Sequence, residues 1–293
     1  MKKAVAIILT AVFMFALAGC GSSDSGKSAG SSGPGALEKA RQQGYVTVGF
    51  ANEKPYAYAT TDGKLTGEAV EVARAVLKKM GINEMQGVLT EFGSLIPGLK
   101  AKRFDMITAG MFITPQRAKE VDFANPEYSI GEALVVKKGN PKNLHSYQDL
   151  ANNKEAKVAA VAGGVEHGYL LKSGVPAERI VVVPDNPSSI AALQSGRVDA
   201  ITMTGPAIQS LLDDAKDPGL ERVMDFKQPV IDGKSVRGYG ATAFRQEDDD
   251  FREAFNQELQ KMKESGELLE IIKPFGFTQQ ELPGDTKADD LTK

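Results

Sequence analysis

Apolar residues recur along the chain in short runs, and most of these runs have the length and the flanking turn residues of buried strands. Segment 67–80 differs, because its apolar residues share one face of a helix. Strands that alternate with such helices predict an α/β fold. The predicted strands are 45–50, 87–91, 105–111, 132–138, 157–161, 180–183 and 240–245, and the predicted helices are a short one before Tyr45, 67–80, one after Gly163-Gly164, one from Pro206 and 249–265.

Two stretches of the sequence match each other in pattern. Residues 96–108 (IPGLKAKRFDMIT) and 190–202 (IAALQSGRVDAIT) share Ile, Leu, Arg, Asp, Ile and Thr in register. Each predicts a short helix, a tight turn and a strand that opens with Asp. We therefore expect two lobes of similar build that offer strand ends to a shared cleft. Residues 132–138 and 240–245 would cross between the lobes, so that lobe 1 comprises 36–135 plus 238–281 and lobe 2 comprises 136–237.

The first residues have the pattern of a targeting segment. Lys2 and Lys3 precede an apolar run, 4–18, that is too short for an ordinary transmembrane helix and ends in Leu-Ala-Gly-Cys20. This ending resembles a bacterial lipobox, which implies a signal peptide over 1–19, a lipidated Cys20 and a protein anchored at the extracytoplasmic face of the membrane. The alternative is a cleaved secretory peptide with a chance cysteine. Cys20 is the only cysteine, so no disulfide is expected.

Composition and the chain ends narrow the possible functions. Residues 20–35 are a Gly/Ser-rich linker, and 282–293 form a polar tail that we expect to fray. A net charge of −3 argues against a nucleic-acid partner. His145 and His167 lack the spacing of metal ligands, and neither a catalytic triad nor a phosphate-binding glycine loop is evident. We expect a monomer without metal, cofactor or catalytic residues.

Residues 103–126 (RFDMITAGMFITPQRAKEVDFANP) carry the most specific chemistry. A buried strand runs directly into Thr114 and Pro115, which suit the N-cap and first position of a helix. Arg117 in the predicted first turn offers a planar fork of donors suited to a carboxylate, with the ring of Phe112 beside it. The alternative is that Arg117 faces solvent or pairs with Glu120.

These phrases resemble a known family. Residues 102–111, 114–128 and 196–200 are similar to motifs of the extracellular solute-binding proteins of polar amino-acid ABC importers, which have the periplasmic-binding-protein-like type II fold. The resemblance covers 36–277 and implies a two-lobe α/β clamshell that delivers a small solute to a permease driven by an ATPase. Within that family, the chain resembles the ectoine- and hydroxyectoine-binding subunits through 51–56 (ANEKPY), 91–93 (EFG), 96–99 (IPGL), 135–141 (VVKKGNP) and 273–277 (KPFGF).

Two positions depart from the amino-acid-binding pattern. Thr204 stands where the family's carboxylate for an α-ammonium group is expected, and Phe112 stands where a Thr is usual. An unpaired buried ammonium is costly, so a free amino acid fits poorly. Ectoine is a cyclic zwitterion whose delocalised amidinium can lie against aromatic faces.

The resemblance assigns roles to particular residues. Aromatic faces would come from Tyr56, Phe92 and Phe112, the acceptor for the ring N–H groups from Glu53, and the carboxylate partner from Arg117. The remaining expected ligand-binding residues are Gly110, Val165 and Thr204, with Val165 at a position where close relatives tend to carry Thr.

Other interpretations stay open at this point. Each ring could serve ordinary lobe packing, Glu53 could be a solvated loop acid near Lys54, and Thr204 could simply end its strand. Glu166 could be a helix-start charge partner only. The ligand could be a polar amino acid or a betaine, and the same fold hosts cyclohexadienyl dehydratases, in which Glu53 or Glu166 would serve as the acid.

Overall fold

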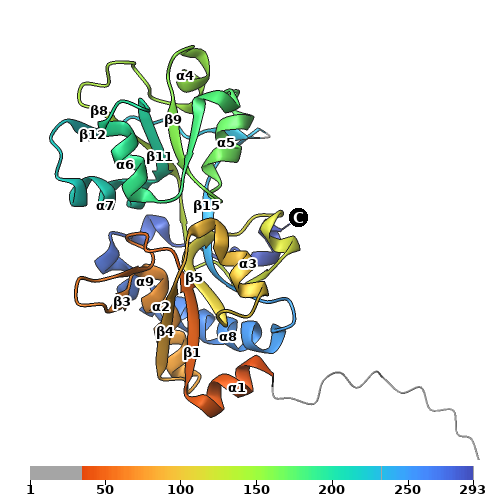
Figure 1. Cartoon of the computed structure of the whole chain (residues 1–293). Helices are drawn as coiled ribbons and strands as arrows, with labels where there is room; N and C mark the ends of the chain where they lie inside the picture. The colour runs from red at the N-terminus through yellow and green to blue at the C-terminus, as the bar shows by residue number, and fades with distance from the viewer. Residues whose placement is uncertain (1–34, 232, 293) are drawn as a thin grey trace, which may run out of the picture. The chain divides into compact units, whose positions relative to one another are not determined.

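The structure is a computed structural model that describes residues 35–231 and 233–292. These residues form a two-lobe α/β body of the periplasmic-binding-protein type II fold, as predicted, with one main sheet in each lobe and two segments that cross between them (Figure 1). The predicted signal peptide, Cys20 and nearly all of the linker lie outside the described residues. Within the described part of the chain, no helix combines the length and the apolar character needed to span a bilayer.

Lobe 1 is built on a mixed sheet of six strands. Strand β1 lies parallel between β4 and β5, and β15 returns antiparallel along β5 and pairs with β6 and β7. The strands are β1 (Tyr45–Phe50), β4 (Glu84–Leu89), β5 (Met106–Phe112), β6 (Asp122–Phe123), β7 (Tyr128–Ile130) and β15 (Gly238–Phe244), with a small hairpin of β2 (Tyr58–Ala59) and β3 (Leu65–Thr66) beside them.

Helices cover both faces of this sheet because successive residues of β5 alternate between two apolar clusters. Met106 and Phe112 belong to the cluster that includes α2, α8 and α9, whereas Ile107 and Met111 belong to the cluster that includes α3. The predicted face of α2 is fully buried. The helices of lobe 1 are α1 (Ala36–Gln43), α2 (Glu68–Lys79), η1 (Phe92–Ser94), α3 (Leu95–Lys100), η2 (Arg117–Lys119), α8 (Asp249–Ser265), α9 (Glu267–Ile272), η4 (Lys273–Phe275), η5 (Gln279–Glu281) and α10 (Ala288–Leu291).

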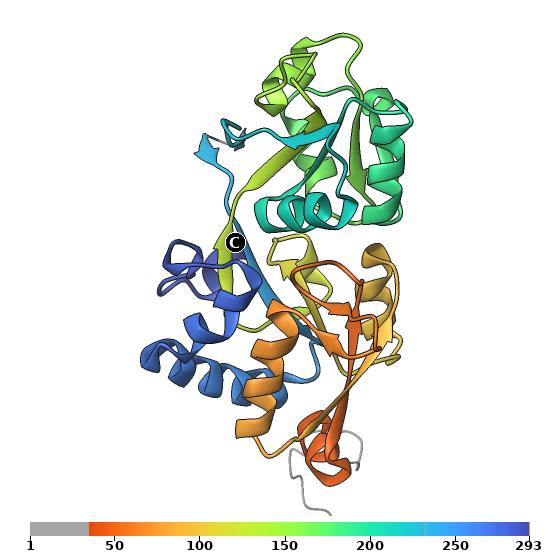
Figure 2. The same ribbon diagram turned by 90° about the vertical axis from the view of Figure 1, so that its left-hand side faces the viewer.

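Lobe 2 has a five-stranded sheet in the order β10-β9-β11-β8-β12, with helices packed around it (Figure 2). Its strands are β8 (Glu132–Lys137), β9 (Val158–Val161), β10 (Ile180–Val183), β11 (Ala200–Thr204) and β12 (Leu220–Arg222), followed by a hairpin of β13 (Val230–Ile231) and β14 (Lys234–Ser235). Its helices are α4 (Tyr147–Asn152), α5 (Glu166–Lys172), η3 (Ala177–Arg179), α6 (Asn186–Gln194) and α7 (Gly205–Ala215).

The matched stretches fold into the same local structure in both lobes, as predicted. Asp105 Oδ2 accepts a hydrogen bond from the Thr47 N–H at 2.8 Å, and Asp199 Oδ2 accepts one from the Lys157 N–H at 2.9 Å. Each Asp therefore fastens the start of its own strand to the start of the neighbouring strand. The turn before each strand contains a residue with positive φ, Lys102 at 57° and Gly196 at 75°.

The first crossing lies earlier than predicted. Strand β7 ends at Ile130 in the sheet of lobe 1, and β8 begins at Glu132 in the sheet of lobe 2, so a boundary after Val135 would cut β8. The amide of Gln228, on the returning segment, bonds both the N–H and the carbonyl oxygen of Glu132 at 2.8 Å. A Cβ on Gly131 would lie 2.7 Å from that amide, so a larger residue there would displace Gln228 from Glu132.

The C-terminal tail is packed, and the prediction that it frays was wrong. Ala288 is buried in the α3-side cluster of lobe 1, and Leu291 packs against the same cluster. The Ala288 N–H also donates to Asn125 Oδ1 at 3.2 Å. These two apolar side chains stabilise a segment whose overall polarity suggested a free end.

Candidate functional site

A small cavity between the lobes brings together all eight predicted ligand-binding residues. Its volume is about 40 Å³, which is enough for only a few water molecules. Lobe 1 and lobe 2 contribute equally to the lining. The lining residues are Glu53, Tyr56, Phe92, Gly110, Phe112 and Arg117 from lobe 1, and Val161, Gly164, Val165, Glu166, Met203 and Thr204 from lobe 2.

Arg117 is held in place by main-chain carbonyl groups of both lobes. Its Nη1 donates to the Phe112 carbonyl oxygen at 2.7 Å, and its Nη2 donates to the Gly163 carbonyl oxygen at 2.8 Å. The guanidinium also lies 5.4 Å from the centre of the Phe92 ring. Burial lowers the pKa of Arg117 and the charge of Glu166 opposes this, but an arginine stays protonated in proteins. The site therefore has a permanent cation with N–H groups to spare.

The predicted helix at Thr114 is only a single 3₁₀ turn. Thr114 Oγ1 accepts a hydrogen bond from the Arg117 N–H at 3.2 Å, as an N-cap would, but the turn ends at Lys119. The chain then enters β6 at Asp122, so no helix dipole develops here. Glu120 pairs with Lys100 at 3.1 Å, which leaves Arg117 directed to the cavity.

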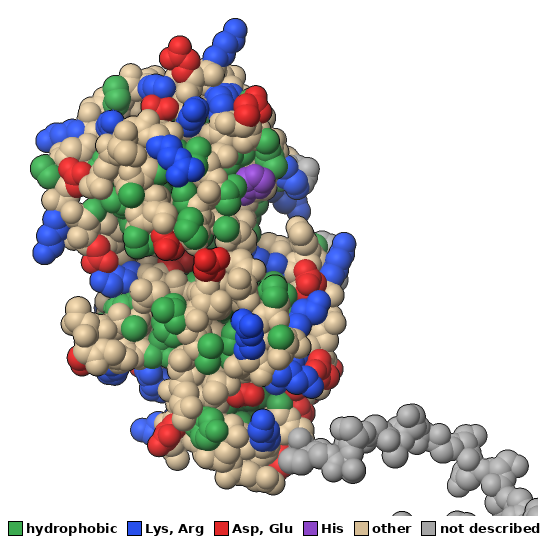
Figure 3. All heavy atoms as spheres, in the orientation of Figure 1, with side chains coloured by type: hydrophobic (Ala, Val, Ile, Leu, Met, Phe, Trp, Pro, Cys, Tyr) green, Lys and Arg blue, Asp and Glu red, His purple; other side chains and the backbone are tan. Residues whose placement is uncertain are grey.

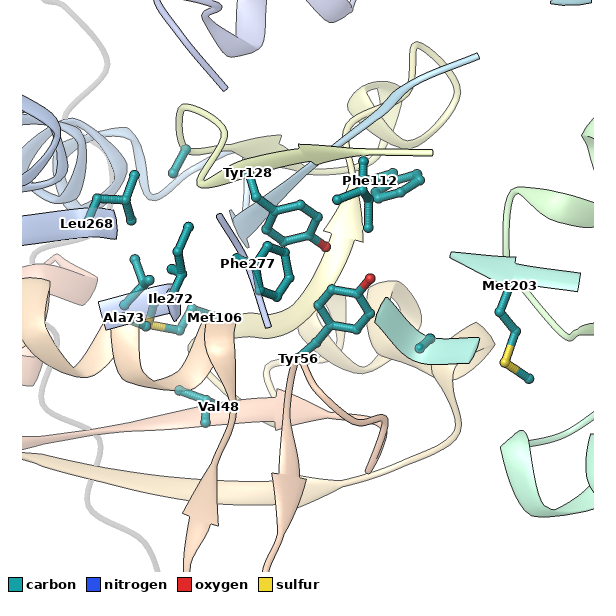
Figure 4. Close-up of a cluster of buried hydrophobic side chains, with 14 of the residues drawn as sticks. Val48, Tyr56, Ala73, Met106, Phe112, Tyr128, Met203, Leu268, Ile272 and Phe277 are labelled. Carbon is teal, nitrogen blue, oxygen red and sulfur yellow. The ribbon is translucent and has the colours of Figure 1, made fainter. Parts of the chain in front are cut away.

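The aromatic residues of the cavity belong to a larger ring cluster. Tyr56 stacks on Tyr128 with ring centres 5.4 Å apart, and Phe112 meets Tyr128 edge-on at 6.4 Å (Figure 4). Phe277 packs against both tyrosines. Tyr56 and Phe112 therefore do both: each ring packs in the aromatic cluster of lobe 1, and each ring also lines the cavity.

Gly110 makes room for these rings. Its φ is +64°, and a Cβ there would lie 2.5 Å from the Tyr56 ring. Its carbonyl oxygen accepts a hydrogen bond from the Tyr128 hydroxyl at 2.8 Å. A side chain at this position would displace Tyr56 from the cavity wall.

Glu53 lies in a tight loop that turns its carboxyl group into the cavity. The Glu53 N–H donates to the Ala57 carbonyl oxygen at 2.8 Å, which closes the loop. Burial, followed by the charge of Glu166, raises the pKa of Glu53 to about 8, while a hydrogen bond from Asn186 opposes the rise. Lys54 pairs with Asp214 of lobe 2 at 2.9 Å, so Glu53 is not a solvated partner of Lys54.

Thr204 joins lobe 2 to the aromatic cluster. It ends β11 and its Oγ1 lies 2.6 Å from the Tyr56 hydroxyl. Val165 immediately precedes α5 and faces the cavity with an apolar side chain. Thr204 thus does more than end its strand, because its hydroxyl bonds the opposite lobe.

Four lining residues were not among the predicted set: Val161, Gly164, Glu166 and Met203. Glu166 was interpreted as a helix-start partner, yet it is buried and lines the cavity. Burial raises its pKa, and the nearby Arg117 opposes this. The Gly163-Gly164 turn was the signal that could have found it, since Glu166 directly follows the predicted ligand-binding residue Val165 at this turn.

The chemistry of the site suits binding of a small zwitterion. A fixed cation, Arg117, the carboxyl group of Glu53 and the rings of Tyr56, Phe92 and Phe112 all line the same small cavity. Within 35–231 and 233–292, no cluster of His, Cys, Asp and Glu has the arrangement of a metal site. The surface view shows acidic and basic side chains interspersed on one face of the body, without a continuous basic field (Figure 3).

Comparison with known proteins gives a consistent result. The family model of bacterial extracellular solute-binding proteins, family 3, matches residues 46–278. A probable amino-acid ABC transporter periplasmic-binding protein of Sinorhizobium fredii is 39% identical over 248 residues, which are 84% of this chain and 81% of that protein. The arginine-binding extracellular protein ArtP of Bacillus subtilis is 31% identical over 280 residues, or 93% of this chain and 97% of its own.

A similar solved structure contains hydroxyectoine as its ligand. The crystal structure of EhuB in complex with hydroxyectoine is 38% identical and superposes with a TM-score of 0.79. The match covers 88% of this chain and 97% of EhuB.

Proposed function

Because the chain belongs to the bacterial extracellular solute-binding proteins of family 3, we propose that it binds ectoine or hydroxyectoine between its lobes for an ABC importer. At the coarser level, the chain is a solute-binding protein of an amino-acid-type ABC transporter. The identity of the solute is what we propose.

One observation carries the proposal: Arg117, Glu53 and three aromatic rings line the same cavity. A ligand carboxylate on the Arg117 fork forms strong charge-assisted hydrogen bonds. The amidinium ring would then meet Glu53 and the faces of Tyr56, Phe92 and Phe112, where each cation–π contact contributes about 0.5–2 kcal/mol.

Binding requires the lobes to separate first. The cavity as it stands is too small for an organic solute, and the Arg117–Gly163 and Tyr56–Thr204 contacts hold the two walls together. In the proposed mechanism, the solute enters the open cleft and binds the lobe-1 wall, and rotation about the two crossings then closes lobe 2 over it. The closed form would be the one that the permease recognises.

The proposed partners are a membrane permease and its cytoplasmic ATPase, in keeping with the names of the relatives. We further propose that Cys20 carries a lipid anchor that keeps the protein at the extracytoplasmic face of the membrane. Incorporation of a labelled fatty acid into the intact chain, and its loss in Cys20→Ala, would test the anchor.

A cationic amino acid is the second candidate. Two carboxyl groups, those of Glu53 and Glu166, line a cavity that has one guanidinium, and an arginine-binding relative is 31% identical. Arginine would place its carboxylate on Arg117 and its positive groups near the two acids. We propose no enzymatic step; turnover of prephenate or arogenate would revive the dehydratase alternative.

Calorimetric titration of the ligand-free protein tests the proposal. Ectoine, hydroxyectoine, glycine betaine, proline, glutamine and arginine would be compared, and we expect the two ectoines to bind most tightly. Tight binding of arginine or glutamine without binding of either ectoine would overturn the assignment. A thermal-shift screen provides a second readout, because ligand at a hundredfold over its Kd adds about 2.7 kcal/mol of stability.

A further inference from the structure

The two lobes meet backbone to backbone beside the cavity, where the turn before α5 reaches η1. A Cβ on Gly163 of lobe 2 would lie 2.5 Å from the Cα and 3.0 Å from the N atom of Gly93 in lobe 1. The φ of Gly163 is +79°, a conformation that L side chains rarely adopt. The close approach of the lobes at this point therefore requires glycine at 163.

The same turn supplies the lobe-2 partner of Arg117. The Gly163 carbonyl oxygen accepts a hydrogen bond from Arg117 Nη2 at 2.8 Å, whereas the bond from Nη1 goes to Phe112 in lobe 1. The ring of Phe92, which directly precedes Gly93, lies 5.4 Å from the guanidinium. We call the close approach of Gly93 to Gly163, together with the Arg117–Gly163 hydrogen bond, the mouth contact.

The mouth contact lies in a groove that the two crossings do not reach. Its three residues line this groove outside the cavity, and no described residue of 130–132 or 228–237 does. Residues of those crossing segments line a different groove, together with Lys54. Because lobe 2 rotates about the crossings, a point far from them moves more than a point close to them. Opening of the cleft therefore breaks the mouth contact before it breaks the Lys54–Asp214 ion pair.

Loss of the mouth contact leaves the guanidinium less constrained. Arg117 would keep its Nη1 bond to Phe112 within lobe 1, but its Nη2 would lose the Gly163 carbonyl oxygen. A side chain held by one hydrogen bond samples more orientations than a side chain held by two, so ordering it around a solute costs more conformational entropy. The orientation of Arg117 thus depends on closure of the lobes.

Resting on the proposed function, we propose that Gly93 and Gly163 are positioning residues that act through Arg117. Their close approach brings the Gly163 carbonyl oxygen to the guanidinium, so that Arg117 is fixed for the solute carboxylate only when the lobes are closed. A larger residue at 93 would hold the turn of lobe 2 away from lobe 1. Arg117 would then keep only its bond within lobe 1, and the solute would bind more weakly.

Calorimetry with hydroxyectoine on Gly93→Leu tests the inference. Gly93 has no left-handed φ, so its own backbone tolerates a side chain. We expect the affinity to fall about tenfold, the value of one hydrogen bond to a charged group. Gly93→Ala should have a smaller effect, because a Cβ there meets its nearest neighbour, the Ala162 carbonyl oxygen, at 3.4 Å. Glu91→Leu, which adds the same side chain at an exposed position just before η1, is the matched control and should keep the native Kd.

A double-mutant cycle with Arg117→Ala then separates positioning of Arg117 from simple obstruction of closure. If Gly93→Leu acts through Arg117, its effect on Kd should largely disappear in the Arg117→Ala background, whereas independent effects would add. Additive effects with the melting temperatures preserved would overturn the inference, as would native affinity in Gly93→Leu.

The proposed function and this inference fail in different ways. If the native protein binds arginine but neither ectoine, the proposed solute is wrong, and the same cycle measured with arginine decides the role of Gly93 and Gly163. If hydroxyectoine binds the native protein and the cycle is additive, the proposed function stands and the inference is wrong.

Discussion

The two walls of the cavity rest on similar scaffolds but have different chemistry. Both lobes contain the same helix, turn and Asp-opened strand, fastened by Asp105 in lobe 1 and by Asp199 in lobe 2. Beyond these strands, lobe 1 presents a guanidinium, the Glu53 carboxyl group and aromatic rings, whereas lobe 2 presents the Thr204 hydroxyl, the Glu166 carboxyl group and aliphatic side chains. A repeated scaffold therefore does not repeat the site, because the residues past the strand ends determine the chemistry.

This difference suggests that the two lobes have different roles. Lobe 1 binds the charged ends of the solute, and lobe 2 closes over the solute and distinguishes between related solutes. Substitutions in the lobe-1 wall should then reduce affinity for every solute of the class. Substitutions in the lobe-2 wall should mainly change the ratio between related solutes.

Arg117→Ala should have the largest effect. Loss of a buried, charge-assisted partner of the ligand carboxylate costs about 2–5 kcal/mol, which corresponds to at least a thirtyfold loss of affinity. Arg117→Lys should rescue it only in part, because an ammonium cannot reproduce the planar fork. Calorimetry gives the Kd values, and Lys119→Ala on the same 3₁₀ turn is the exposed control. Native-like affinity in Arg117→Ala would refute the role of this residue.

Glu53 should link binding to the release of a proton. Its pKa of about 8 leaves it protonated at pH 7 in the ligand-free protein, whereas an amidinium ligand requires the carboxylate. Binding at pH 7 should therefore release about one proton, and affinity should rise with pH up to about 8 and then level off. Titrations in buffers of different ionisation enthalpy measure the proton directly. Proton release that persists in Glu53→Gln would point to another group.

The same carboxyl group has the opposite effect on the stability of the ligand-free protein. An unfolded Glu loses its proton near pH 4.5, whereas folded Glu53 keeps it up to about pH 8. The folded state thus holds more protons in this window, and stability falls as the pH rises through it. We expect the contribution to disappear in Glu53→Gln, as measured by denaturant unfolding at pH 5 and pH 8.

Phe112→Leu should weaken an amidinium ligand by about 1–3 kcal/mol, through lost ring area and lost cation–π attraction. Leucine is used because Phe112 also packs on Tyr128 and against Gly238, so that alanine would leave a cavity. The matched control is Phe226→Leu, whose ring packs on Tyr147 in lobe 2. An unchanged Kd in Phe112→Leu would show that the Phe112 ring does not contribute to ligand binding.

The rim contact between the lobes should matter least. Lys54 and Asp214 form an ion pair at 2.9 Å, but their side chains are 43% and 57% exposed. Such pairs contribute about 0–1 kcal/mol and are screened by salt. Asp214→Asn should therefore change Kd by less than about fivefold, and the change should shrink in high salt. A larger, salt-independent effect would mean that closure depends on the rim rather than on the cavity walls.

The sequence was sufficient for the elements whose cause is local. Strand β5 and the buried face of α2 follow from the apolar pattern, and the repeated motif predicted two lobes. The residues brought to the cavity from lobe 1 were predicted because they lie in or next to the recognisable motifs. Their roles in binding stay predictions.

The remaining features depend on contacts between distant parts of the chain. The helix expected at Thr114 ends after one turn because the chain then forms β6, which pairs with β15 in the sheet. The tail is ordered by Asn125, 163 residues away from Ala288. Glu132 lies beside Thr204 because β8 pairs with β11, which no local pattern reveals. Local periodicity predicts elements, but it does not report which buried acids meet.

The orientation of the solute is the central claim, and a crystal structure of the protein with hydroxyectoine tests it most directly. We expect the solute carboxylate within about 3 Å of the Arg117 guanidinium, the ring N–H groups at hydrogen-bond distance from Glu53, and the ring between Tyr56, Phe92 and Phe112. A solute bound with its carboxylate away from Arg117, or outside the cavity between the lobes, would contradict the account.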